Sequence, residues 1–303
     1  MRGVNIPLGY FSVFRKHLTG AVLISSILAF FFPSASEQRQ IEKTVFRFAP
    51  AAGARLDYNI LGMVSMSGKN PLGKDLSLTA VTQGVLHFAV LTSTRDAVRA
   101  RLTSPGIEVR VQVPDRTLSE VLSTREGQAL EVAFNETGRI KEIRNPDALS
   151  QERILNFSLP QILNDYFPVL SAEPVSPGRG WSESRRMAIP FEGFELLVQL
   201  KTDYVLNDVV PFGQDRQALI TTFFSVTVSG RRDLGDLVGV FEGRGTGTGF
   251  LHFLVGRSVF TEYKIDFKTD AAFVVKRGEE RLYEWPFAFS VSVYVTMANR
   301  AGF

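Results

Sequence analysis

The side chains best suited to acid–base or metal chemistry in residues 37–303 are two histidines, His87 and His252. Each stands between a leucine and a phenylalanine in an alternating stretch. Because successive side chains of a strand point to opposite faces, a histidine flanked by two core residues faces away from the core. A metal site or an acid–base pair would also need carboxylates or a second histidine at ligand spacing. We see none, and we therefore expect no metal site and no catalytic residues.

A run of alternating glycines from Gly243 to Gly249 is the segment most suggestive of nucleotide binding. No Gly-x-Gly-x-x-Gly pattern fits within it, and an apolar strand follows where phosphate binding needs the start of a helix. Alternate glycines occupy one face of a strand, where they permit sharp bending. The run therefore predicts a bent strand, and close approach of a ligand is the alternative.

Nucleophilic and redox chemistry also lack their usual residues. The chain has no cysteine, which excludes disulfides, a thiolate nucleophile, a thiolate metal site and a lipid-modified cysteine. It has no Gly-x-Ser-x-Gly and no Ser-x-x-Lys motif. We expect no enzymatic activity and no cofactor.

Aromatic residues are the feature that remains. Of 25 phenylalanines, twenty lie outside residues 1–36, and many of these crowd the second half of the chain. Core packing accounts for most of them. The alternative is that some line a cavity for an acyl chain or similar apolar ligand inside a strongly curved sheet. The residues expected to line such a cavity are Phe223, Phe241, Phe250, Phe253 and Phe267.

Period-two alternation dominates the chain and predicts strands that bury one face, as at 54–60, 107–113 and 287–295. The exception is 146–167, where apolar residues recur at helical spacing and Pro160 divides the stretch into two short helices. These helices would form a lid or plug. The expected fold class is mainly β with a small helical insertion, built as two related, strongly curved antiparallel sheets or half-barrels.

The sequence also indicates an internal duplication. Segments 84–90 and 249–255 share the pattern Gly-x-Leu-His-Phe-x-Val, whereas a competing alignment pairs 127–143 with 247–265. A repeat of this length favours domain duplication over a solenoid. The expected parts are a first β-rich half at 37–172 that includes the helical segment, a Pro/Gly linker at 173–182, and a second β-rich half at 183–303.

Residues 1–36 have the order of a secretory signal peptide. Basic residues without acidic ones precede an apolar run from Ala21 to Phe32, and the small residues Ser34-Ala35-Ser36 follow. Twelve apolar residues make a helix of about 18 Å, short of the ~30 Å hydrocarbon core. We expect a cleaved signal and no other transmembrane span, with an uncleaved anchor as the alternative. The expected location is the periplasm or cell exterior of a bacterium.

The charge balance argues against a nucleic-acid partner. The chain has 34 basic and 31 acidic residues, but three of the basic residues lie in 1–36, which holds no acidic residue. The rest of the chain therefore has 31 of each kind and no net charge. Nucleic-acid binding needs a positive field, and we expect no nucleic-acid partner.

Several turn motifs point to a family resemblance. They are 128–140 with its Asn135-Glu136-Thr137-Gly138 turn, Phe167-Pro168, the linker from Val175 to Trp181, Tyr204-Val205-Leu206, and the glycine run before a strand. Over roughly 45–297 the chain resembles an uncharacterised family of bacterial exported proteins, a domain of unknown function. It departs from the family pattern at Asn135, where the family has Asp, and at Gly180, directly before the tryptophan. That family has no known activity and assigns no functional residue.

At the level of fold, a curved antiparallel sheet with a helical insertion is similar to the periplasmic lipoprotein carriers (LolA/LolB-like half-barrels). The resemblance implies an open half-barrel that holds acyl chains, by analogy of fold alone.

Two functions follow from these observations. The first is an exported, non-enzymatic protein that binds or carries a lipid or other apolar ligand. The second is a structural or interaction module of the bacterial envelope, with a filled core, a possible envelope protein partner and no small-molecule ligand. A third hypothesis, an outer-membrane β-barrel, is prompted by the terminal Phe303. It is not favoured, because residues 298–302 do not alternate apolar and polar and the strands lack clear aromatic girdles.

Overall fold

A computed structural model describes residues 42–303 apart from 70–74, 146–147, 149–166, 192–193 and 299–303. The expected signal peptide at 1–36 and nearly all of the expected helical insertion at 146–167 lie outside the described residues. In the part of the chain that is described, no helix is long and apolar enough to cross a membrane.

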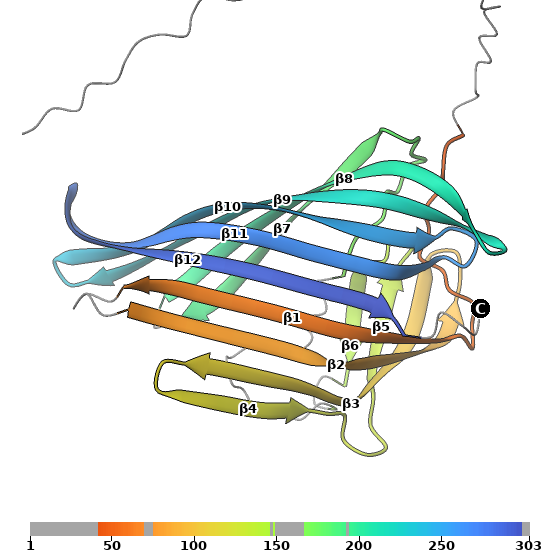
Figure 1. The fold of residues 1–303 in the computed structure, drawn as a ribbon, viewed down its shortest axis with the longest axis horizontal. Coiled ribbons are helices and arrows are strands. Elements are labelled where there is room, and N and C mark those ends of the chain that lie inside the picture. The colour runs from red at the N-terminus through yellow and green to blue at the C-terminus, as the bar shows by residue number, and fades with distance from the viewer. Residues whose placement is uncertain (1–41, 70–74, 146–147, 149–166, 192–193, 299–303) are drawn as a thin grey trace, which may run out of the picture. The chain divides into compact units, whose positions relative to one another are not determined.

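The described residues form one antiparallel sheet of twelve strands, which confirms the mainly β prediction (Figure 1). The strands are β1 (Arg55–Lys69), β2 (Asp75–Ser93), β3 (Ala97–Val113), β4 (Arg116–Leu122), β5 (Leu130–Asn135), β6 (Ile140–Arg144), β7 (Gly180–Phe191), β8 (Phe194–Phe212), β9 (Asp215–Leu234), β10 (Leu237–Leu254), β11 (Val259–Arg277) and β12 (Glu280–Met297).

The first and last strands pair with each other and join the two halves of the chain. The order across the sheet is β6-β5-β3-β2-β1-β12-β11-β10-β9-β8-β7, and β4 pairs with β3 beside this path. The β1–β12 ladder runs in unbroken register from Tyr58 opposite Met297 to Gly68 opposite Phe287. The prediction of two separate sheets is therefore wrong, because this pairing removes the free edge that each half would otherwise present. The boundaries expected for the halves and for the linker at 173–182 stay predictions.

One face of the sheet is apolar along most of its length, and we call it the inner face. On β11, for example, Tyr263 and Ile265 are buried on the inner face. The intervening Lys264 and Asp266 lie on the opposite, outer face, where they form an ion pair. This alternation is the pattern expected of a sheet that faces an apolar interior on one side and water on the other.

The sheet curls so that strands far apart in its order meet over the inner face (Figure 1). Phe48, from the segment before β1, packs on Phe134 of β5 and Phe260 of β11, with ring centroids 5.1 and 5.3 Å away. Phe46 likewise contacts Trp181 of β7 and Phe253 of β10. Four strands separate β5 from β11, so only a curled sheet brings them to one phenylalanine.

The two ends of the curled sheet differ in how they are filled. The end that holds the β2–β3, β8–β9 and β10–β11 turns contains the large core cluster around Phe46 and Phe48, and we call it the proximal end. The opposite, distal end holds the β9–β10 and β11–β12 turns and contains a second, smaller apolar cluster of Leu196, Phe241 and Ala271, which we call the distal cluster.

Glycines on the inner face of β10 allow part of this curl. A Cβ atom added at Gly247 would lie closer than 3.0 Å to the carbonyl oxygen of Asp266 and to Cβ of Phe267, both on β11. A Cβ atom added at Gly243 would lie 2.7 Å from Cβ of Ala271. The backbone of β11 thus occupies the space that side chains on β10 would need, which explains glycine at these positions.

We expect Gly247→Ala to lower the free energy of unfolding by about 1–3 kcal/mol, because the added methyl group forces β10 and β11 apart. Gly62→Ala on β1 is the matched control, since its Cβ would meet nothing closer than 3.6 Å. Urea denaturation followed by circular dichroism measures both. Equal losses in the two variants would contradict this explanation of the glycine run.

Two tyrosines lie in the proximal core with few polar partners. The hydroxyl of Tyr58 donates to the carbonyl oxygen of Phe260 at 3.1 Å, and the amide of Val169 donates to the hydroxyl of Tyr204 at 3.4 Å. Burial raises the pKa of Tyr58, and it raises the pKa of Tyr204 to about 12. The fold therefore favours the neutral phenols.

This burial gives a pH dependence of stability. The unfolded chain releases these protons near pH 10, whereas the folded chain keeps them, so the free energy of unfolding should fall as the pH rises above about 10. We expect Tyr204→Phe to reduce that alkaline loss by about 2 kcal/mol at pH 12. Tyr283→Phe, at a side chain that is 60% exposed, should leave it unchanged. Urea denaturation between pH 7 and pH 12 measures the difference, and parallel pH profiles for the wild type and Tyr204→Phe would contradict it.

Candidate functional site

Both histidines lie on the outer face, as their apolar neighbours predict. Nδ1 of His87 lies 2.6 Å from Oδ1 of Asp57, and Nδ1 of His252 lies 2.7 Å from Oε2 of Glu262. Tyr294 donates its hydroxyl to the other oxygen of Glu262 at 2.8 Å. Each histidine thus has one carboxylate beside it on a neighbouring strand. Over the described residues, no three His, Cys, Asp or Glu side chains come close enough together to hold a metal ion.

The five phenylalanines expected to line a cavity divide between the two faces. Phe253 is fully buried in the proximal core, Phe241 is buried in the distal cluster, and Phe267 is half-buried on the inner face. Phe223 lies on the outer face of β9 with 45% of its surface exposed, and Phe250 lies on the outer face beside His252. The structure therefore brings three of them to the inner face, at different points along it, and does not gather all five.

The inner face at the distal end is only partly covered. We call it the distal apolar face, and define it by six partly exposed side chains: Ile60, Val64 and Met66 of β1, Leu76 and Leu78 of β2, and Phe289 of β12, of which Ile60 borders the proximal core cluster. They are neighbours across the ladders, since Met66 pairs with Leu78 on one side and with Phe289 on the other. Apolar side chains that stay half-exposed on a concave face are the usual lining of a binding site for apolar molecules.

The distal cluster continues this surface onto the strands of the second half. Phe241 lies 6.2 Å from both Phe287 and Phe289, measured between ring centroids, and packs with Leu196 and Ala271. Phe289 therefore belongs to both the cluster and the distal apolar face. The apolar surface thus extends from β2 across β1 and β12 to β10.

The five phenylalanines expected from the sequence include no residue of the distal apolar face. The alternation of apolar residues at 60, 62, 64 and 66 contains the signal, because it places Ile60, Val64 and Met66 on the same face as the core residue Tyr58. The glycine and serines interspersed there weaken the pattern, and methionine and valine carry no aromatic cue.

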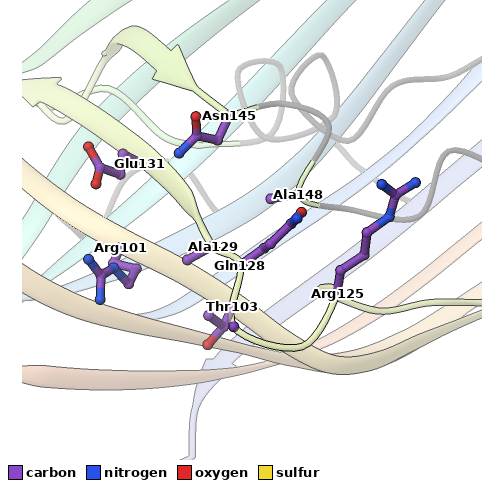
Figure 2. A pocket seen from close by; sticks show the side chains of 9 residues that line it. Arg101, Thr103, Arg125, Gln128, Ala129, Glu131, Asn145 and Ala148 are labelled. Atoms are coloured by element: carbon purple, nitrogen blue, oxygen red, sulfur yellow. The ribbon is translucent and has the colours of Figure 1, made fainter.

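A hollow of about 730 Å³ lies on a different part of the molecule (Figure 2). Its lining residues are Arg101, Thr103, Arg125, Gly127, Gln128, Ala129, Glu131, Asn145 and Ala148. Arg101 and Glu131 face each other across the β3–β5 ladder, on the outer face. The volume would admit a small molecule, but the lining is mainly polar and includes none of the five phenylalanines. This hollow is not the expected apolar cavity.

A partly buried ion cluster joins the β5–β6 turn to the distant strand β7 at the proximal end. Glu183 of β7 is buried on the inner face and accepts hydrogen bonds from Arg139, in the β5–β6 turn, at 2.6 Å and from Arg185 at 2.9 Å. Arg185 also donates to the carbonyl oxygen of Phe167 at 2.6 Å. Burial disfavours the charge of Arg185, but the hydrogen bond and attraction of Glu183 outweigh it and raise the pKa of Arg185. The cluster links the β5–β6 turn to β7 although their strands share no backbone ladder.

We expect Glu183→Gln to lower the free energy of unfolding by about 2–4 kcal/mol, because it leaves a buried guanidinium without its counter-charge. Glu142→Gln is the matched control: that carboxylate pairs with Arg144 at 2.8 Å, but both side chains are about half-exposed. Exposed pairs contribute at most about 1 kcal/mol. Urea denaturation at pH 7 compares the two, and equal losses would show that the cluster does not hold the β5–β6 turn against β7.

Comparisons with known proteins do not assign this chain to a family. No family model matches it, and no curated protein sequence matches it. Among solved structures, an outer membrane channel from Pseudomonas putida F1 aligns with 82% of this chain and 97% of its own, at 11% identity and a TM-score of 0.24. OpdQ from Pseudomonas aeruginosa aligns with 80% of this chain and 99% of its own, at 8% identity and a TM-score of 0.20. Scores this low do not establish a shared fold.

Proposed function

We propose that this chain is an exported, non-enzymatic protein that binds or carries a lipid or another apolar ligand on its distal apolar face. The observation that carries the proposal is the unequal filling of one continuous inner face. At the proximal end Phe46 and Phe48 fill it, whereas at the distal end Val64, Met66 and Leu78 remain partly exposed.

An acyl chain suits this surface in size and chemistry. The stretch from Ile60 to Met66 spans about 20 Å at the usual rise per residue of a strand, enough for an extended chain. Each buried methylene group contributes about 0.8 kcal/mol. Contact along this length would therefore bind a long acyl chain without requiring a charged group on the distal apolar face.

The outer face supports an aqueous setting for the sheet. Along β11 its side chains include Lys264, Asp266, Lys268 and Asp270, and the first two form an ion pair. A face of this kind is suited to solvent and not to a lipid-facing wall. Export itself rests on the signal-like order of residues 1–36.

A structural or interaction module of the envelope is the second candidate. It is favoured by the filled proximal core and by the polar character of the hollow in Figure 2. In that case the distal apolar face would be covered by a protein partner instead of a small ligand.

Two methionines on one strand give a matched test of the proposal. Met66 lies on the inner face opposite Phe289, whereas Met63 lies on the outer face opposite Ser292 and is 46% exposed. We expect a fluorescent fatty acid, cis-parinaric acid, to bind the wild type, and Met66→Asp to weaken its binding about tenfold or more, since the carboxylate would contact the acyl chain. Met63→Asp should change the affinity less than twofold.

Circular dichroism and urea denaturation of both variants verify that they are folded. Should Met66→Asp be unfolded, Met66→Gln serves in its place, with Met63→Gln as its control. No binding of the probe to the folded wild type, or equal weakening in both variants, would contradict the proposal and leave the structural module.

A further inference from the structure

Three stacked aromatic rings stand at the β11–β12 tip of the distal end. Trp285 stacks on Phe273 at a centroid distance of 5.3 Å and on Tyr283 at 5.8 Å, with interplanar angles of 13° and 4°. The Tyr283 ring is 60% exposed, the most exposed of the large apolar and aromatic side chains described. Stacked tyrosine and tryptophan at a projecting hairpin are a costly surface in water, because their apolar rings are only partly covered.

This tip is continuous with the distal apolar face. Along β12 the inner-face residues from the turn inward are Tyr283, Trp285, Phe287, Phe289 and Val291. The first is exposed, the next four are half-buried, and Val293 after them is 8% exposed. An unbroken aromatic stripe therefore leads from the exterior of the molecule to the proposed ligand surface.

The charges around the tip include no excess of basic residues. Arg277 pairs with Asp236 of the β9–β10 turn at 3.6 Å, and Arg281 pairs with Glu242 at 3.3 Å and with Glu284 at 3.1 Å. The arginines therefore have acidic partners within the protein, and they provide no net positive patch for anionic lipid headgroups. Tyrosine and tryptophan favour the boundary between headgroups and acyl chains whatever the headgroup charge.

We propose that the β11–β12 tip docks onto the surface of a lipid bilayer and places the aromatic stripe in contact with its acyl chains. This inference rests on the proposed function, since the stripe would pass an acyl chain between the bilayer and the distal apolar face without exposing it to water. The occupant of the tip is a lipid surface, and the attraction is apolar and aromatic, not electrostatic.

Brominated phosphatidylcholine vesicles test the docking directly, since bromine quenches only tryptophans that reach the acyl region. The chain has two tryptophans, Trp285 at the tip and Trp181, which lies in the proximal core and donates to the carbonyl oxygen of Val169. With the complete chain we expect quenching that persists at 0.5 M NaCl. Trp285→Phe should abolish the quenching while vesicle flotation continues, because phenylalanine keeps the ring but not the fluorophore.

Substitution by aspartate tests the affinity. We expect Tyr283→Asp to reduce partition into vesicles about tenfold. The matched control is Phe212→Asp, at a phenylalanine that is 43% exposed in the β8–β9 turn region of the opposite end, and it should change partition less than twofold. No variant changes residues 1–36, and that segment contains no tryptophan. Any membrane binding by the segment is therefore the same in every variant and does not produce the expected differences between variants.

The outcomes separate this proposal from the proposed function. Quenching that survives Trp285→Phe, a larger loss from Phe212→Asp than from Tyr283→Asp, or no quenching of the wild type would overturn docking through the tip. Binding of cis-parinaric acid in vesicle-free solution measures the ligand surface independently. Probe binding without vesicle quenching would refute only the docking, whereas quenching without probe binding would refute the proposed function and leave the tip as a membrane contact alone.

Discussion

A single-layered sheet that is apolar over most of one face must bury that face, and this sheet does so by curling on itself. Among the described residues no second sheet and no helix covers it, so burial depends on strands that are distant in the sheet order approaching each other. The β1–β12 ladder makes the curl possible, because it places the two halves of the chain in one continuous surface. Glycines on β10 then let β11 approach closely, and the ion cluster around Glu183 fastens the β5–β6 turn to β7.

The same constraint explains why the two ends differ. The segments before β1 and before β7 supply Phe46, Phe48 and Leu170, which fill the proximal end from within. Nothing among the described residues does the same at the distal end, where inner-face side chains keep part of their exposure. A binding surface for an apolar molecule follows from this difference in filling, without any residue whose chemistry is specialised. That is consistent with a sequence in which histidines, glycines and acidic residues form no recognisable catalytic pattern.

The local features of the fold could be predicted from the sequence, and the long-range ones could not. Alternation predicted the strands, and the Leu–His–Phe context placed His87 and His252 on the outer face, because period two is a property of each strand alone. The pairing of Tyr58 with Met297 joins residues at opposite ends of the chain, and no local pattern encodes it. Phe223 illustrates the error in the candidate site: its neighbour Phe224 occupies the inner face, and composition alone does not tell the two apart.

Both proposed roles, ligand binding and membrane docking, depend on whether an apolar molecule occupies the distal apolar face. Native mass spectrometry of the protein recovered from a bacterial periplasmic fraction, followed by organic extraction, measures this most directly. We predict a stoichiometric adduct that extraction identifies as a lipid or fatty acid, and its loss in Met66→Asp but not in Met63→Asp. A single mass equal to that of the polypeptide, for protein that is folded and taken directly from the periplasm, would contradict the account.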